Sequence, residues 1–234
     1  MNPLAVITSG TKGIGRATVE RFFKEGFDVV TCARSKADLE ALKGTLEASN
    51  QGKVYFQTAD MSKREDVSAF ANFVQNLGRS VDVLVNNTGI FIPGAIHEEE
   101  EGNLEKMIET NLYSAYHLTR ALVGDMKAKK RGHIFTTGSI AGITAYDNGG
   151  SYSISKFALL GFTKCLREEM KPHGVRVTSI LPGATYTASW EGVDIPRERF
   201  MKPEDIADAI YACHALSNQT VVEEIVLRPQ LGDI

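Results

Sequence analysis

The sequence has few cysteines and no excess of basic residues. Its three cysteines, Cys32, Cys165 and Cys213, lie far apart and show no spacing typical of metal ligands. They offer neither a disulfide framework nor a zinc site, so we expect a reduced, cytoplasmic setting. Lys and Arg total 26 against 29 Asp and Glu, which gives a formal net charge of -3. This balance argues against binding to nucleic acid or to an anionic membrane surface.

The sequence also lacks long apolar runs, repeats, linkers and low-complexity segments. Its N-terminus, MNPLAVITSG, has no charged region followed by a long apolar region, so we expect neither secretion nor membrane insertion. A length of 234 residues suits one α/β domain over residues 1–234. Such a chain buries a sizeable core but has no room for a separate substrate domain.

The sequence does contain short β-branched runs that alternate with longer helical patterns. Strands are expected at residues 4–8, 28–33, 53–58, 81–87, 132–139, 175–183 and 223–229. Helices are expected at residues 13–26, 35–48, 62–78, 103–129 and 152–171, and from residue 203 onward. Ser35 and Asp38 would form one capping box, and Ser62 and Glu65 would cap the next helix. This alternation predicts a doubly wound Rossmann α/β fold, a three-layer sandwich with a seven-stranded, largely parallel sheet.

Residues 139–156, SIAGITAYDNGGSYSISK, gather a hydroxyl, a phenol and an ammonium in one short segment. Tyr152 and Lys156 are four residues apart, so a helix would place them on one face. A neighbouring cation lowers the pKa of a phenol from about 10 toward the range that suits general acid-base catalysis. Ser139 would then hold the reacting oxygen. For the pair alone, the alternative is a solvated stripe on a helix.

A glycine-rich loop, TSGTKGIG at residues 8–15, follows the first strand and opens a helix. Glycines there let the backbone approach a pyrophosphate, whose charge suits the N–H groups of a helix N-terminus. Arg34 ends the second strand, where a dinucleotide fold meets the adenosine ribose. An acid at that point binds the 2′-OH, whereas Arg34 with Lys12 suits a 2′-phosphate, so NADP(H) is favoured over NAD(H). The alternative for Arg34 is a solvated surface residue.

Several motifs together resemble the short-chain dehydrogenase/reductase family over almost the whole chain and in the family's order. They are TSGTKGIG, Asn86-Asn87-Thr88-Gly89, Asn111, Ser139, Tyr152-Ser-Ile-Ser-Lys156 and Pro182-Gly183. The resemblance implies a catalytic set of Asn111, Ser139, Tyr152 and Lys156, in which Asn111 holds a water that links Lys156 to solvent. It also implies that Asp60 binds the adenine amino group and that residues 182–187 contact the nicotinamide carboxamide.

The NADP(H)-binding residues expected from this resemblance are Ser9, Gly10, Thr11, Lys12, Gly13, Ile14, Gly15, Arg34, Asp60, Met61, Asn87, Thr88, Gly89, Tyr152, Lys156, Pro182, Gly183, Thr185 and Thr187. Some positions depart from the family pattern. The family usually has Gly at Ser9, Ala at Thr88 and Asn at Thr178, and the common D-G-G ending is missing. The path of the glycine loop and the form of the C-terminal edge are therefore open.

The resemblance implies an oxidoreductase that acts on CH–OH groups with NADP as acceptor, reducing a carbonyl to an alcohol or running in reverse. The substrate candidate is a 3-oxoacyl group on an acyl carrier protein, with a small carbonyl or a 3-hydroxy acid as alternatives. A non-catalytic NADP(H)-sensing protein is the alternative from another class. An acidic carrier needs a basic patch, which Lys127, Lys129, Lys130 and Arg131 offer. A helix C-terminus that favours cations explains the same residues more simply.

Further expectations concern partners and pockets. We expect a homotetramer or homodimer, because family members pair the helices at 103–129 and 152–171, and the second carries Phe157, Leu159, Leu160, Phe162 and Leu166. His97 and the run from Glu98 to Glu101 fit a solvated helix start better than a metal site, since adjacent ligands rarely converge. An apolar substrate pocket is expected from residues that flank the motifs: Phe91, Ile92, Ile143, Tyr146, Tyr186 and Trp190.

Overall fold

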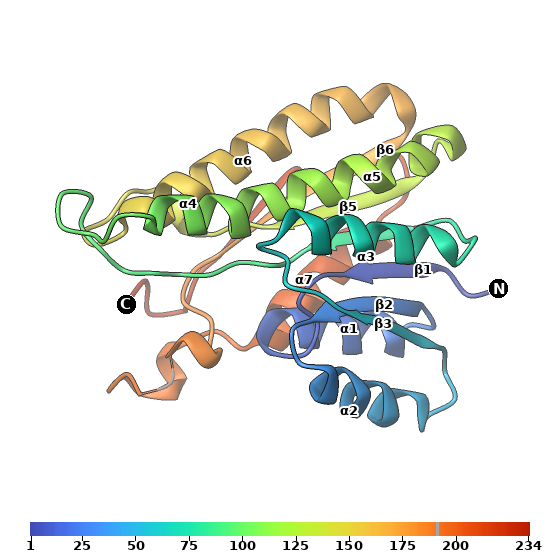
Figure 1. Cartoon of the computed structure of the whole chain (residues 1–234), viewed down its shortest axis with the longest axis horizontal. Coiled ribbons are helices and arrows are strands. Elements are labelled where there is room, and N and C mark those ends of the chain that lie inside the picture. The colour runs from blue at the N-terminus through green and yellow to red at the C-terminus, as the bar shows by residue number, and fades with distance from the viewer. Residues whose placement is uncertain (191) are drawn as a thin grey trace.

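Parallel strands form one sheet, in the order β3-β2-β1-β4-β5-β6-β7, in the computed structural model, which describes residues 1–190 and 192–234 (Figure 1). The strands are β1 Leu4–Ile7, β2 Asp28–Ala33, β3 Val54–Thr58, β4 Val83–Asn86, β5 Gly132–Thr137, β6 Val175–Pro182 and β7 Glu224–Leu227. Every neighbouring pair is parallel, so the predicted doubly wound fold with a seven-stranded sheet is confirmed.

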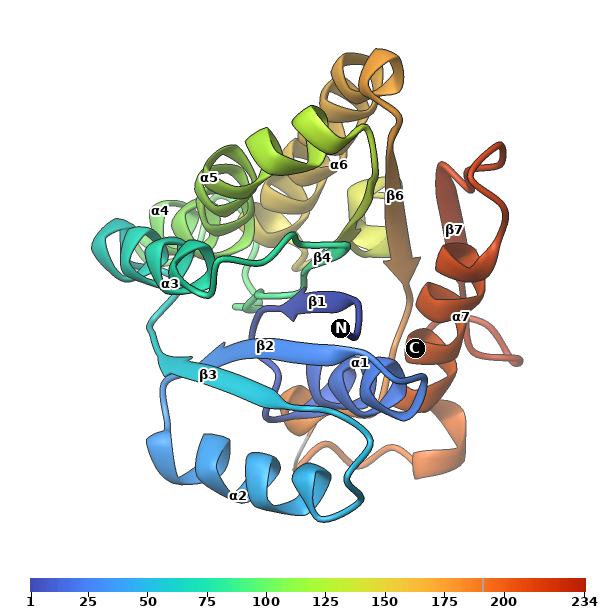
Figure 2. The ribbon, with the colours of Figure 1, turned by 90° about the vertical axis from the view of Figure 1, so that its right-hand side faces the viewer.

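Helices cover both faces of this sheet, as Figure 2 shows. One apolar core joins the sheet to α3, α5 and α6, and the other joins it to α1, α2 and α7. The helices are α1 Gly13–Lys24, α2 Lys36–Glu47, α3 Arg64–Asn76, α4 Asn103–Ile108, α5 Ser114–Lys129, α6 Gly150–Met170 and α7 Pro203–Ala215. Within the described part of the chain, no helix has both the length and the apolar character needed to cross a membrane.

The central strands β1 and β4 are buried along their whole length because helices cover both faces of the sheet. In β1, Leu4 and Val6 enter one core while Ala5 and Ile7 enter the other, as expected for side chains that alternate along a strand. The order of the strands reverses between β1 and β4. From β1, the next strands β2 and β3 are added toward one edge of the sheet, and from β4 the strands β5, β6 and β7 are added toward the other. The carboxyl ends of such strands flank the crevice where doubly wound folds bind ligands.

Three expected helices differ in detail. The helix predicted at residues 103–129 is interrupted by a π-helical turn, Glu109–Tyr113, between α4 and α5. Helix α6 begins at Gly150 rather than at Tyr152. The cap predicted for Ser62 is wrong: α3 begins at Arg64, so the N-cap position falls on Lys63, which offers no side-chain cap, and the Ser62 hydroxyl donates to Asp60 at 2.8 Å. The cap predicted at Ser35 is confirmed, since its side chain accepts from the Asp38 backbone N–H.

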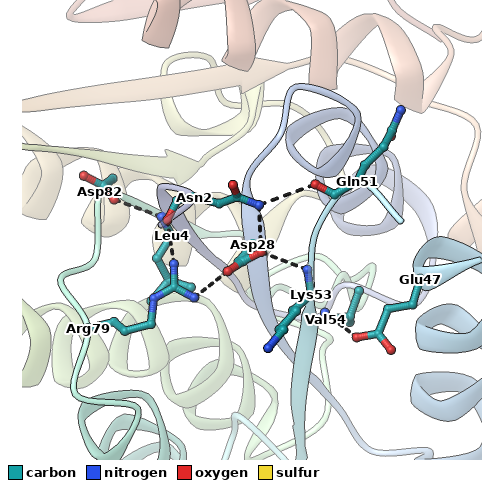
Figure 3. A network of polar contacts seen from close by, with 9 residues as sticks. All are labelled: Asn2, Leu4, Asp28, Glu47, Gln51, Lys53, Val54, Arg79 and Asp82. Atoms are coloured by element: carbon teal, nitrogen blue, oxygen red, sulfur yellow. Dashed lines mark hydrogen bonds and ion pairs between the residues drawn. The ribbon is translucent and has the colours of Figure 1, made fainter. Parts of the chain in front are cut away.

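Carboxylates accept hydrogen bonds at the amino-terminal ends of the strands, around the start of β2 (Figure 3). The buried Asp28 accepts from the Arg79 guanidinium at 2.6 Å, from the Lys53 backbone N–H at 2.8 Å and from the Asn2 amide at 3.1 Å. Asp82 accepts from the Leu4 backbone N–H at 2.9 Å. These side chains satisfy backbone donors that the ends of the strands would otherwise leave unpaired.

Two histidines lie close together where α7 packs against the sheet. The rings of His133 on β5 and His214 on α7 are 5.8 Å apart. Thr178 donates its only hydroxyl proton to the Val222 carbonyl, so it must accept from Nε2–H of His133. Burial, with a smaller effect of Arg176, lowers the pKa of His133 to about 2 and the pKa of His214 to about 4. Both rings are therefore neutral in the folded protein at neutral pH.

These neutral rings should make the protein lose stability in mild acid. Each histidine has a pKa below its unfolded value of about 6.5, so the unfolded chain takes up the proton first. The stabilising contribution is complete above that pH and is lost as the pH falls toward the folded pKa. Urea unfolding should show a free energy of unfolding that declines from about pH 7 to about pH 5, by up to about 1.4 kcal/mol per pH unit and histidine.

The variant His133→Gln should show a weaker dependence, because glutamine can still donate to Thr178 but does not titrate. The exposed His97 provides the control, and His97→Gln should follow the wild-type curve. Equal pH dependence in His133→Gln and the wild type would contradict the assignment of a buried neutral ring.

Candidate active site

A cleft of about 990 Å³ opens at the carboxyl ends of the strands. It brings together residues from the glycine loop, the ends of β2 to β6, the start of α6 and the segment after β6. Most residues expected to bind the cofactor line it: Ser9, Thr11, Lys12, Gly13, Ile14, Arg34, Asp60, Met61, Asn87, Thr88, Gly89, Tyr152, Lys156, Pro182, Gly183, Thr185 and Thr187. Ser139 lines it as well, so the structure gathers these side chains into one site.

Gly10, Gly15 and Asn111 do not line the cleft. A Cβ on Gly10 would meet Thr31 Oγ1 at 2.1 Å, and one on Gly15 would meet the Ser9 carbonyl oxygen at 2.2 Å. These two glycines therefore let the loop pack closely against β2 and against itself. Their part in a binding site is to shape the loop rather than to face a ligand.

Ser9 and Thr88, two positions that depart from the family pattern, contact each other. Their hydroxyl oxygens are 2.8 Å apart, so one donates to the other. Ser9 has a φ of 55°, in the left-handed region where glycine is the usual residue. Serine adopts the backbone conformation of a glycine here, and its hydroxyl forms a hydrogen bond with Thr88, which also lines the cleft.

Positive charge gathers at the end of the cleft formed by β2 and the glycine loop. Lys12 and Arg34 line it, close to the N-terminus of α1. Burial would raise the pKa of Asp60, but hydrogen bonds from Ser62 and the positive charges of Arg34 and Lys63 lower it overall. Cations, a helix N-terminus and close-packed glycines together fit a phosphorylated dinucleotide.

The opposite part of the cleft holds the hydroxyl, the phenol and the ammonium. Lys156 Nζ donates to the Thr137 carbonyl at 3.0 Å and lies 5.7 Å from the centre of the Tyr152 ring. Ser139 Oγ accepts from the Ala141 backbone N–H at 3.1 Å, which leaves its own proton free to donate. Placed side by side, the three groups could hold an oxygen atom and supply a proton to it.

Burial controls the protonation of these groups. It raises the pKa of Tyr152 to about 12, although the hydrogen bond with Ser139 lowers it in part. Burial also lowers the pKa of Lys156 to about 8. The net direction is opposite to the lowering expected from a neighbouring cation, because desolvation of the phenol has the largest effect on its pKa. At neutral pH the phenol holds its proton and can act as a donor.

Asn111 supports the site from the π-helical turn, where it is fully buried. Its amide accepts from the Ile90 backbone N–H at 2.7 Å and donates to the Ile90 carbonyl and to Ser155 Oγ. Ser155 in turn donates to the Tyr152 carbonyl at 2.7 Å. Sequence reasoning missed Ser155, although it stands directly before Lys156 in the same motif.

Aromatic side chains form the wall beside the phenol. Phe91, Tyr146 and Trp190 line the cleft as expected, and the Phe91 ring meets Tyr152 edge to face at 4.8 Å between centroids. Ile92, Ile143 and Tyr186 do not line it, and Tyr186 instead packs against Phe200. Asp233 and Ile234 line the cleft without any signal in the sequence, and Figure 1 shows the chain end on the same side as the start of α4.

Comparisons with known proteins agree with this geometry. The short chain dehydrogenase family model matches residues 3–196. A sepiapterin reductase of Chlorobaculum tepidum is 35% identical over 243 residues, covering 100% of this chain and 99% of that protein. A 3-oxoacyl-acyl-carrier-protein reductase of Haemophilus influenzae is 29% identical over 217 residues, with 88% of each chain covered.

A solved alcohol dehydrogenase from the archaeon Thermococcus sibiricus, complexed with 5-hydroxy-NADP, has a TM-score of 0.91 at 28% identity. The similarity covers 100% of this chain and 99% of that one. The family match spans far more than half of the sequence, and the relatives match it nearly end to end. The chain therefore belongs to the short-chain dehydrogenase family.

Proposed function

We propose that this protein is an NADP(H)-dependent oxidoreductase that reduces a carbonyl to an alcohol or runs the reverse reaction. The observation that carries the proposal is one cleft with Lys12 and Arg34 at one end and Ser139, Tyr152 and Lys156 at the other. The solved alcohol dehydrogenase with 5-hydroxy-NADP and a metagenomic relative in complex with NADP support the choice of cofactor.

The residues of the cleft fit such a cofactor. The glycine loop and the N-terminus of α1 would hold the pyrophosphate, with Arg34 and Lys12 at the 2′-phosphate. Residues 182–187 would hold the nicotinamide end. When bound, NADPH supplies the hydride, and the protein supplies orientation and the proton.

The side chains then have distinct tasks. Ser139 donates to the carbonyl oxygen, and Tyr152 gives that oxygen its proton as negative charge develops there. Lys156, held by the Thr137 carbonyl, keeps a positive charge beside the phenol. Asn111 is committed to Ile90 and Ser155, so its main task is to hold the backbone around Tyr152. Its predicted link to solvent through a water stays a prediction.

The aromatic wall favours a flat, compact substrate over a long flexible one. Phe91, Tyr146 and Trp190 offer ring faces and edges on which a heteroaromatic ring can stack. The sepiapterin reductase from Chlorobaculum tepidum supports this preference. We propose a carbonyl on or beside a bicyclic heteroaromatic ring, of the sepiapterin kind, as the first candidate.

A 3-oxoacyl group on an acyl carrier protein is the second candidate, supported by the Haemophilus influenzae relative. Two members of the expected basic patch are neutralised by neighbours, because Lys129 pairs with Asp125 and Arg131 pairs with Asp82. The patch also lies at the C-terminus of α5, beside the amino end of β5, whereas the cleft opens at the carboxyl ends of the strands. A carrier would need another subunit beside it to reach a site.

Self-association is a further part of the proposal. Leu159, Leu160 and Leu166 of α6 are buried within the chain itself. Contrary to the expectation, these three side chains are therefore not available for an interface. Large apolar side chains on the outer faces of α4 to α6 are exposed by about two fifths or more: Leu104, Tyr113, Tyr116, Ile154 and Phe157. Such a self-complementary face suits a two-fold dimer, or a tetramer built from two of them.

The central test removes the proton donor. The variant Tyr152→Phe should lower kcat by at least ~100-fold, while NADPH affinity by fluorescence titration changes little, because the phenol is not a phosphate ligand. NADPH oxidation is measured with sepiapterin, a 3-oxoacyl-carrier substrate and small ketones. Tyr55→Phe, on β3 and outside the cleft lining, is the control. If the wild-type protein turns over none of these substrates, the NADP(H)-sensing alternative is favoured. Near-normal turnover in Tyr152→Phe would reject the mechanism.

Cofactor preference should depend on Arg34. The variant Arg34→Asp loses the charged hydrogen bonds to a 2′-phosphate and adds repulsion, so NADPH should bind at least about tenfold more weakly. Binding of NADH should change much less. Lys36→Asp is the matched control, since Lys36 is exposed, pairs with Glu40 and does not line the cleft. Equal changes in affinity for NADPH and NADH would show that Arg34 does not contact the 2′-phosphate.

Light scattering tests the self-association. The expected mass is two or four times the 25.6 kDa of one chain, and Phe157→Glu should shift it toward the monomer by placing a charge in the proposed interface. The control is Leu216→Glu at the end of α7, which is similarly exposed but lies on the opposite face of the sheet from α4, α5 and α6. A wild-type mass of one chain at micromolar concentration would reject the proposal.

A further inference from the structure

The segment between β4 and α4, residues 87–102, is fastened to α6 on both sides of Tyr152. The first fastening lies after the tyrosine. It runs from the Ile90 backbone through Asn111 to Ser155, whose hydroxyl donates to the Tyr152 carbonyl. The Phe91 ring adds an edge-to-face contact with the Tyr152 ring itself.

The second fastening lies before the tyrosine and depends on Glu99. Ser151, which is buried and directly precedes Tyr152, donates its hydroxyl proton to Glu99 Oε1. Close by, the Gly94 backbone N–H donates to the Asn148 carbonyl at 3.0 Å. The segment and the helix approach so closely that a Cβ on Gly150 would lie 2.4 Å from the Gly94 carbonyl oxygen. A Cβ on Gly94 would lie 2.8 Å from the Glu99 Cβ.

Glu99 differs from its acidic neighbours in this respect. Glu98, Glu100 and Glu101 are exposed, as expected for a solvated run, whereas Glu99 is half-buried. Its second oxygen, Oε2, is buried and has no hydrogen-bond partner among the described residues. Burying a carboxylate oxygen is costly, so this position needs a compensating gain.

The start of α6 offers that gain. Its first residues have no side-chain cap of their own, because Gly149 precedes the helix. A carboxylate beside the first turn stabilises the positive end of the helix dipole. Glu99 supplies this charge from another part of the chain, to the turn that carries Tyr152.

We propose that Glu99 is a positioning residue for Tyr152. By holding Ser151, it fixes the first turn of α6, and with it the place of the phenol between Ser139 and Lys156. The inference rests on the proposed function, because it assigns Glu99 to the geometry of that reaction. Glu99 itself does not line the cleft, so it acts only through the helix.

Kinetic measurements test the inference with three variants. Glu99→Ala should lower kcat by about tenfold to a hundredfold, since a small misplacement of an acid has effects of this size. Ser151→Ala should resemble it, and the double variant should lose little more, because both changes break one contact. Glu99→Gln keeps the reach and an acceptor for Ser151, so it should lie closer to the wild type. Glu100→Gln, on an exposed neighbour, is the matched control.

Two further readouts separate positioning from a general loss of stability. The KM for NADPH should stay within about twofold of the wild type, because the phosphate end of the cleft is untouched. The basic limb of the kcat pH profile reports loss of the Lys156 charge, at a pKa of about 8, before it reports the phenol. It should move to higher pH in Glu99→Ala, because a loosened turn admits water and desolvation then lowers the pKa of the ammonium less. The titratable groups that face this phenol are Lys156 on α6 and Tyr146 on the preceding loop.

Hydrogen exchange by mass spectrometry tests the inference without any turnover. Backbone amides of residues 149–157 should exchange faster in Glu99→Ala and Ser151→Ala, and at the wild-type rate in Glu100→Gln. If the wild type reduces no carbonyl, the proposed function fails while this measurement still decides the role of Glu99. Unchanged exchange in Glu99→Ala would overturn the inference. A kcat that falls only in step with the folded fraction would overturn it as well.

Discussion

Burial of the Lys156 ammonium is the constraint on which the rest of the cleft depends. The side chain is almost entirely removed from water and donates to the Thr137 carbonyl, at the end of β5. A buried charge is costly unless polar groups surround it, so α6, the end of β5 and the loop after β4 must meet at this point. Gly89 permits the meeting, because a Cβ there would lie 3.3 Å from Lys156 Nζ.

The amino-terminal and carboxyl-terminal ends of the strands differ in how their backbone groups are surrounded. At the amino-terminal edge, the carboxylates of Asp28 and Asp82 accept from backbone N–H groups and from Arg79. At the carboxyl edge, Gly10 and Gly15 let the glycine loop pack closely against β2 and against itself, beside the cleft. Side-chain anchors thus hold one edge of the sheet, and the other is left as a shaped surface for binding.

The contact between Ser9 and Thr88 shows how two departures from a family pattern can depend on each other. Each position carries a hydroxyl where the family usually has a smaller residue, and the two hydroxyls form one hydrogen bond. This bond joins the glycine loop to the loop after β4 across 79 residues of sequence. The positive φ of Ser9 costs free energy, and the shared hydrogen bond offsets part of that cost.

The sequence by itself determined the strands, the parallel sheet and the pairing of Tyr152 with Lys156, because these depend on patterns within a few neighbouring residues. Only the tertiary structure decided which groups surround them. The π-helical turn that buries Asn111, the contact of Glu99 with Ser151 and the raised pKa of Tyr152 all arise from segments that are remote in sequence. Even the local cap expected at Ser62 failed, because the packed chain begins α3 one residue later, with Lys63 at the N-cap position. Burial and long-range hydrogen bonds are properties of the packed chain, so no window of the sequence contains them.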